Sequence, residues 1–264
     1  MGIVRSVGEC IYCGANEGLT REHIIPLSLD GHDELGEASC TACMIVTSAI
    51  EYHLARGSWW PHRRRLGMAT RRPSEQPKSF TGVYSPDDEP ENVDILPEHF
   101  TSLILPDFGR PSMVFGERGA PYKGAPGILA VAIKAGPVSV VRRNGRGIHR
   151  TDSRIKLDVK LNIDTFVRFL AKVALAKAIA TYGIEPFEEL YLREIVLGSL
   201  DEVNSYIGRA SSLLLGDLPG LEYFRAQVFT LRDRVHVYIQ CFAEPGVETP
   251  IYEVVVGKLR RDDV

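Results

Sequence analysis

The sequence lacks a run of apolar residues long enough to cross a bilayer, and its N-terminus lacks the apolar segment of a secretory signal peptide. It also has few cysteines, five among 264 residues, and four of the five fall in two close pairs. Paired thiols of this kind are more typical of metal sites than of the disulfides of exported proteins. We therefore expect a cytoplasmic protein that has no membrane partner.

The chain also lacks a strong excess of charge, since its formal net charge is -3. This near-balance does not by itself indicate a protein that binds nucleic acid. Hydrophobic residues make up 44% of the chain and charged residues 25%, as in ordinary globular proteins. A chain of 264 residues suffices for one large domain or two modest ones. Indications of function must therefore come from local patterns.

Two CxxC pairs lie near the N-terminus, Cys10 with Cys13 and Cys40 with Cys43. A CxxC turn directs two thiolates to the same ion, and two such turns provide the four sulfur ligands that tetrahedral zinc prefers. Disulfides are the alternative, but nothing else in the sequence indicates an oxidising compartment. The spacing therefore predicts a structural Zn2+ site at these cysteines.

The box Glu22-His23-Ile24-Ile25-Pro26 lies between the two pairs. Together with the cysteines it resembles the HNH endonuclease family, ββα-metal nucleases with a four-cysteine zinc site, over residues 8–56. The resemblance implies that His23 is a general base, that Glu22 is a ligand of a catalytic Mg2+ or Mn2+ ion, and that the substrate is DNA. These residue types suit the chemistry, because histidine titrates near neutrality and a carboxylate is a hard oxygen ligand.

Two positions depart from the HNH pattern. Met44 follows Cys43, where the family has a His or Asn that ligates the catalytic ion, and Leu35 stands near the place of a buttressing Asn. If a helix begins at Cys43, Glu51 lies about two turns beyond Met44 and could supply the missing ligand. The alternative is that Met44 marks a chain without catalytic activity.

A basic segment follows the helix that we expect over residues 41–54. From Tyr52 to Ser74 there is no acidic residue. Guanidinium groups bind phosphates bidentately, and clustering them adds affinity that falls with salt. We expect this segment to contact double-stranded DNA, the alternative being a solvated basic loop. Its arginines are Arg56, Arg63, Arg64, Arg65, Arg71 and Arg72.

The expected fold class is α+β. Residues 1–75 would form the HNH-like zinc and nuclease domain with its Arg-rich extension, residues 76–98 an acidic, proline-rich linker, and residues 99–264 a mixed α+β domain with antiparallel strands. In the last region, short apolar runs over residues 101–143 predict strands. A helix is expected over residues 163–182, capped by Asp164 and ended by Gly183. The other expected elements are a helix over 187–197 and strands over 224–231, 235–242 and 251–256.

The sequence thus favours a metal-dependent HNH-type endonuclease that hydrolyses DNA phosphodiester bonds. No catalytic motif is found in residues 99–264, so this region is expected to contribute to substrate recognition or to a homodimer. One alternative is a catalytically degenerate zinc-stapled module that binds nucleic acid or a protein, in keeping with Met44 and Leu35. Another is that the C-terminal region carries the function and the zinc site only supports folding.

Overall fold

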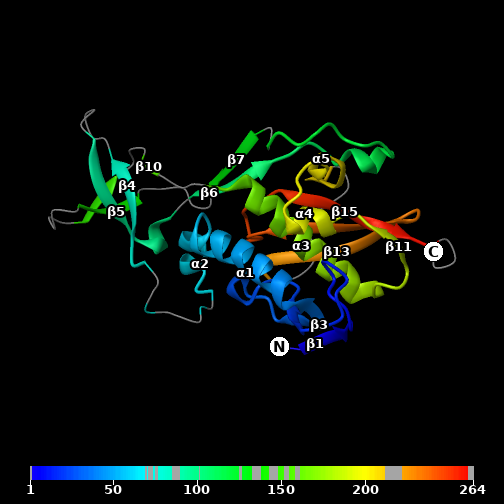
Figure 1. Ribbon diagram of the computed structural model, residues 1–264. Coiled ribbons are helices and arrows are strands. Elements are labelled where there is room, and N and C mark those ends of the chain that lie inside the picture. Colours follow the sequence, from blue (N-terminus) through cyan, green and yellow to red (C-terminus); the bar gives the residue numbers. More distant parts are fainter. Residues whose placement is uncertain are drawn as a thin grey trace.

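The computed structural model describes residues 2–68, 70, 74, 77–84, 90–100, 102–124, 127–132, 138–142, 148–151, 155–157, 161–211 and 222–260. The elements form a mixed α+β structure whose strand pairs are mostly antiparallel, which confirms the expected fold class (Figure 1). Among these residues, no helix combines the length and the apolar character needed to cross a membrane.

The N-terminal module consists of a small sheet followed by a helix. Strand β3 (Asp33–Cys40) lies in the centre, between the parallel strand β1 (Gly2–Ser6) and the antiparallel strand β2 (Leu19–His23). Helix α1 (Thr41–Arg56) follows β3 without a break, so the helix expected in this region is present. A short helix, α2 (Trp60–Arg65), follows α1, with proline in its first turn, where no backbone N–H is needed.

The register of β2 on β3 determines the surroundings of the predicted catalytic pair. Glu22 lies opposite Leu35 and His23 opposite Glu34, beyond an irregularity between Thr20 and Glu22. Neighbouring side chains on a strand point to opposite faces, but β2 ends at His23, so the chain can turn there. Glu22 is buried and His23 is half-buried.

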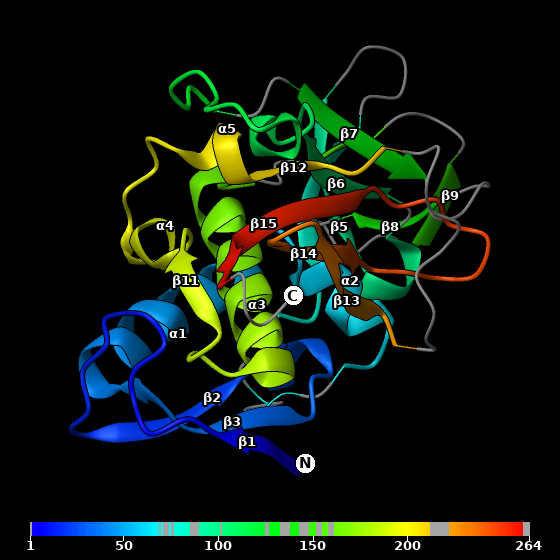
Figure 2. The same ribbon diagram turned by 90° about the vertical axis from the view of Figure 1, so that its right-hand side faces the viewer.

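Helix α3 (Ile163–Tyr182) is the central element and has the predicted bounds. Its cap is Asn162 and not the predicted Asp164, because the Asn162 side chain accepts a hydrogen bond of 2.9 Å from the backbone N–H of Thr165. Gly183 ends the helix with a φ of 85°, a conformation that favours glycine. The helix lies between α1 and the C-terminal sheet, which explains why it is apolar on nearly every side (Figure 2).

The C-terminal sheet has the strand order β11-β15-β14-β13, and a short strand, β12 (Ile207–Arg209), also pairs with β15. The three predicted strands are present with small differences at their ends, as β13 (Phe224–Leu231), β14 (Arg234–Cys241) and β15 (Ile251–Leu259). The helix predicted over 187–197 is wrong in its first part, because β11 (Phe187–Leu190) pairs with β15. Only α4 (Arg193–Leu197) is helical there, and α5 (Val203–Tyr206) follows.

The middle of the chain is also rich in strands. A five-stranded sheet, seen at one end of the molecule in Figure 1, has the order β10-β4-β5-β8-β9. Strands β6 and β7 form a separate pair, and the run SMVF is a 3-10 helix and not a strand. The bounds are β4 (Phe80–Tyr84), β5 (Glu91–Ile95), β6 (Ser102–Asp107), β7 (Gly127–Ala132), β8 (Val138–Arg142), β9 (Ile148–Thr151) and β10 (Ile155–Leu157).

The segment 76–98 was expected to be an irregular linker, but its described part contains two paired strands, β4 and β5. The acidic residues of β5 hid the alternation that buries Val93 and Ile95, which are 0% and 2% exposed. Composition alone therefore gave the wrong local structure here.

One continuous hydrophobic cluster runs from Cys10 to Leu259 and joins the N-terminal module to the C-terminal half. At its centre, Trp59 is 0% exposed, and its ring contacts four phenylalanine rings at centroid distances of 5.1 to 5.8 Å. Trp59, which lies within the basic segment from Tyr52 to Ser74, is thus part of the core.

Candidate metal centre and active-site cavity

The four cysteines of the two CxxC pairs come together at one end of the N-terminal module. Their sulfur atoms all lie within 4.8 Å of one another, and those of Cys13 and Cys40 are 3.6 Å apart. Four thiolates at Zn–S bonds of about 2.3 Å in a tetrahedron would be separated by about 3.8 Å. The observed cluster therefore fits a zinc ion, in agreement with the prediction of a four-cysteine metal site.

The local structure explains how the cluster forms. Cys10 and Cys13 lie in a tight turn, in which the backbone N–H of Gly14 donates to the carbonyl oxygen of Cys10 at 2.8 Å. Cys40 ends β3 and Cys43 lies in the first turn of α1. The backbone N–H of Cys43 lowers the pKa of Cys40 to about 7, whereas burial raises the pKa of Cys10 and of Cys43. The cluster thus fastens β3 and α1 to the turn that precedes β2.

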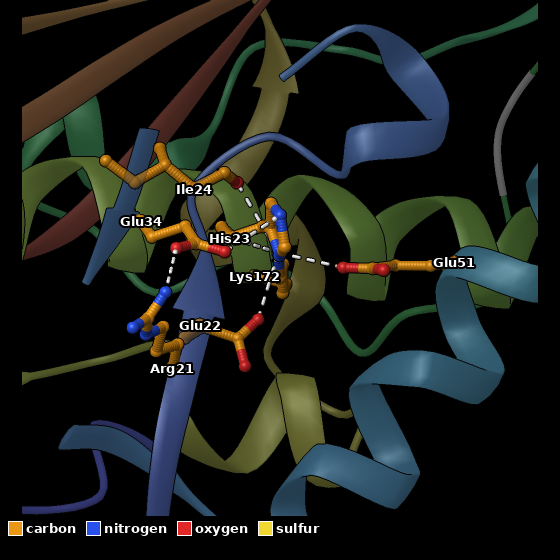
Figure 3. Close-up of polar contacts among 7 residues, drawn as sticks. All are labelled: Arg21, Glu22, His23, Ile24, Glu34, Glu51 and Lys172. Carbon is orange, nitrogen blue, oxygen red and sulfur yellow. Dashed lines mark hydrogen bonds and ion pairs between the residues drawn. The ribbon is translucent and has the colours of Figure 1, made fainter. Parts of the chain in front are cut away.

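A cavity of about 570 Å³ lies beside this module, lined by residues of β2, β3, α1 and α2. His23 lines it, and the Nε2 atom of His23 is 3.1 Å from Oε1 of Glu34. Arg21 also contacts Glu34, at 3.4 Å from Oε2 (Figure 3). The Glu34 carboxylate is thus a close polar neighbour of the imidazole, while Nε2 makes no hydrogen bond within the described residues.

The predicted metal ligands Glu22 and Glu51 also line this cavity, and the structure brings them to a common partner. The ammonium nitrogen of Lys172, on α3, is 3.0 Å from Oε1 of Glu22 and 2.9 Å from Oε1 of Glu51 (Figure 3). The same nitrogen donates a hydrogen bond to the backbone carbonyl of His23 and lies 3.5 Å from that of Ile24. The Lys172 side chain is 0% exposed.

These charges shift the titration of their neighbours. Burial alone would lower the pKa of Lys172, but Glu51 and Glu22 outweigh it and the pKa is raised, so the ammonium stays charged. Burial and the Glu22 carboxylate raise the pKa of Tyr12 well above its ordinary value, which keeps this hydroxyl neutral beside the ion pairs.

The arrangement does not fit a divalent ion at Glu22 and Glu51. A magnesium ion would lie about 2.0–2.1 Å from each carboxylate oxygen, where it would meet the ammonium group that already contacts both. Among the described residues, the four-cysteine cluster is the only group of three or more His, Cys, Asp or Glu side chains whose ligand atoms lie close enough to hold an ion. The interpretation of Glu22 and Glu51 as metal ligands therefore remains a sequence-based expectation that the geometry does not favour.

The two departures from the HNH pattern have different surroundings. Met44 lines the cavity, so a thioether stands on the wall where the resemblance led us to expect an ion-binding group. Leu35 is 0% exposed and packs in the core opposite Glu22. Neither side chain can bind a hard cation.

Two of the arginines that were expected to bind DNA are held by the protein itself. Arg63 is 5% exposed and donates hydrogen bonds to the backbone carbonyls of Ser28 and Ala55. Arg65 forms an ion pair with Glu244 of the C-terminal half. These contacts connect α2 to its surroundings, so Arg63 and Arg65 have structural roles that the sequence did not indicate.

The other arginines are more accessible to a ligand. Arg56 is half-buried and lines the cavity together with Arg21, whose side chain is 66% exposed. Arg64 is exposed on α2. Arg71 and Arg72 lie outside the described residues.

Sequence reasoning missed Glu34 and Lys172. The available signal for Lys172 was a lysine within the apolar stripe of the helix over 163–182, but its partners are 121 to 150 positions away in the sequence. Glu34 could be identified only with the register of β2 on β3.

Comparisons of the chain with models of known protein families, with curated proteins and with solved structures found no match. The resemblance to HNH endonucleases therefore rests on the cysteine pairs and on the Glu22-His23 box, and any activity inferred from it is a proposal.

Proposed function

We propose that the protein is an HNH-like endonuclease that hydrolyses phosphodiester bonds in DNA at the cavity beside His23. The observation that carries the proposal is the contact of 3.1 Å between His23 and Glu34 within a cavity that is also lined by Arg21 and Arg56. A histidine base beside a carboxylate and guanidinium groups suits attack of water on a phosphate.

In this proposal the neutral imidazole of His23, whose Nε2 lies 3.1 Å from the Glu34 carboxylate, takes a proton from water. The water oxygen forms a bond to phosphorus, the bond from phosphorus to a sugar oxygen breaks, and that oxygen takes a proton from solvent. Arg21 and Arg56 would stabilise the negative charge that develops on the phosphate oxygens.

In this proposal the four-cysteine cluster holds a structural Zn2+ ion that fixes β3 and α1 around the cavity. Four closely spaced thiols also suit a reducing compartment such as the cytoplasm. Arg64 on the exposed face of α2 would add contacts to the DNA backbone. Residues 99–264 contribute Lys172 to the site, and a role for them in a homodimer stays a prediction.

A plasmid-nicking assay with zinc-loaded protein tests the proposal. His23→Ala should lower the rate by about 10²–10⁴, the usual contribution of a general base, and should leave DNA binding intact. His53→Ala is the matched control, because His53 is exposed on α1 and does not line the cavity. Equal nicking by native protein and His23→Ala would refute the assignment of His23, and native protein that nicks no DNA, with or without magnesium, would refute the nuclease.

The second candidate is a zinc-stapled module that binds nucleic acid without cutting it. The observation in its favour is that Lys172 already pairs with both carboxylates expected to bind a catalytic ion, while Met44 lines the same cavity. Such a module would bind DNA equally well as native protein and as His23→Ala, and neither would cleave it. Its affinity would fall with salt and on substitution of Arg64.

A further inference from the structure

Lys172 is unusual because a fully buried ammonium group reaches the proposed active site from an element far away in the sequence. It comes from the middle of α3, and its neighbours Ala171 and Val173 are 0% and 1% exposed. Four oxygen atoms surround its nitrogen: one from each carboxylate of Glu22 and Glu51, and the backbone carbonyl oxygens of His23 and Ile24 (Figure 3). All four are oxygen ligands of the kind that a hard cation takes.

The burial of these charges makes the group interdependent. The Glu22 side chain is 5% exposed and that of Glu51 is 25% exposed, whereas that of Lys172 is 0% exposed. A buried charge without a partner is unfavourable, so Glu22 and Lys172 stabilise each other here. Glu51 has partial access to water and depends less on the ion pair.

Lys172 cannot easily leave to make room for an ion. Its helix is packed on several sides, against α1, α4 and the C-terminal sheet, and its ammonium group would have to be buried elsewhere without carboxylates. Its contact with the carbonyl oxygen of His23 also fixes the end of β2, from which the imidazole projects. The same nitrogen therefore neutralises two carboxylates and positions the proposed base.

We propose that Lys172 is the resident cation of this site: its ammonium group takes the place between Glu22 and Glu51 that a divalent ion would need, and it positions His23 so that the hydrolysis proposed above proceeds without magnesium or manganese. Lys172 is a positioning residue, because a side chain that is 0% exposed does not touch the substrate. The positive charge presented to the phosphate comes from Arg21 and Arg56, which line the cavity. The statement about hydrolysis rests on the proposed function, but the exclusion of a divalent ion does not.

The test is a titration of zinc-loaded protein with Mn2+, in which electron paramagnetic resonance measures the free ion. We expect native protein to bind no Mn2+ at Glu22 and Glu51. Binding of one Mn2+ per chain by native protein that is lost in Glu22→Gln or Glu51→Gln would overturn the proposal. Each of these variants keeps one carboxylate partner for Lys172, so it serves as the matched control that shows whether a bound Mn2+ lies at Glu22 and Glu51.

The second arm uses Lys172→Met, which removes the charge and keeps a side chain of similar length. We expect this variant to gain one Mn2+ site that disappears in Lys172→Met/Glu51→Gln. If zinc-loaded Lys172→Met is unfolded in manganese-free buffer, recovery of the fold on addition of Mn2+ supports the proposal. A variant that gains no Mn2+ site, folded or unfolded, contradicts it.

Cleavage supplies the third arm. Nicking by native protein should not increase when Mg2+ or Mn2+ is added. The kcat for nicking by folded Lys172→Met should fall by about 100-fold, which is the effect of a small misplacement of a catalytic group, and KM should change little. If native protein nicks no DNA, the proposed function fails, and the Mn2+ titrations still decide whether Lys172 excludes the ion. Nicking that requires an added divalent ion, and that Glu51→Gln abolishes, overturns the role of Lys172.

Discussion

The buried charges around Lys172 make a specific prediction about stability. In Lys172→Met the ammonium group is lost while the carboxylates of Glu22 and Glu51 stay in place, at side-chain exposures of 5% and 25%. Removing one partner of a buried ion pair costs about 3–5 kcal/mol, because the remaining charge is left without compensation. We expect the free energy of unfolding of Lys172→Met to fall by about this amount in zinc-loaded, manganese-free protein.

The difference in exposure between the two carboxylates predicts which second substitution restores stability. Glu22 has almost no access to water, so Lys172→Met/Glu22→Gln should recover about 1–3 kcal/mol of the loss by removing the unpaired buried charge. Lys172→Met/Glu51→Gln should recover less, because the Glu51 carboxylate can be hydrated where it stands. The order of stability is therefore expected to be native protein, then the Glu22 double variant, then the Glu51 double variant, then Lys172→Met.

Urea denaturation measures these differences. Trp59 is 0% exposed among four phenylalanine rings and should report the loss of the core by fluorescence, with circular dichroism as a second probe. Equal stability of Lys172→Met and native protein would refute the argument from buried charge. So would a greater recovery from Glu51→Gln than from Glu22→Gln.

Other substitutions separate structural from functional roles. Arg63→Ala should lower the free energy of unfolding by about 2–4 kcal/mol, because two hydrogen bonds from a buried charged group are lost. Arg64→Ala should leave stability unchanged and reduce the slope of log K for DNA binding against log salt concentration by about 1. Urea denaturation and binding at several salt concentrations would show the reverse pattern if Arg63 were a DNA ligand. Cys40→Ser should lose the stoichiometric zinc and the cooperative thermal transition of the N-terminal module, and a variant with native zinc content and melting would contradict the four-thiol site. Burial raises the pKa of the Cys241 thiol, so it should react with a thiol reagent only on unfolding, and rapid labelling of native protein at this position would contradict the described core. Met44→Asn alone should gain no Mn2+ site, because the resident ammonium group is still in place, and a gain measured by the same titration would refute this reasoning.

Local patterns predicted the elements that depend on neighbouring residues. The CxxC pairs identified the four-cysteine cluster, which could hold a metal ion, and the apolar stripe over 163–182 identified α3 with its bounds. Where acidic residues interrupted the alternation of β5, the same kind of reasoning gave a linker in place of a strand. Helical periodicity also placed Glu51 on the same face of α1 as Met44, and both side chains line the cavity.

The composition of the site depended on contacts that no local pattern records. Glu34 lies opposite His23 only because of the register of β2 on β3, and a shift of one residue in that register would direct the Glu34 side chain to the other face of the sheet. Lys172 looks like any lysine that interrupts an apolar helix, because its role depends on packing against a module about 150 residues earlier. Long-range charge pairing is decided by the assembled fold, so it could not be derived from spacing.

The two unexpected residues at the site, Met44 and Lys172, are explained together by the resident-cation proposal. If an ammonium group already neutralises Glu22 and Glu51, the position after Cys43 has no ion to bind, and a thioether that packs on the cavity wall is tolerated there. If a divalent ion occupied the site instead, Met44 would present a soft, weakly binding sulfur to a hard cation and Lys172 would add a positive charge beside it. The second arrangement is unfavourable at both positions and the first at neither, so Met44, which departs from the HNH pattern, and Lys172 together support a site built without a divalent ion.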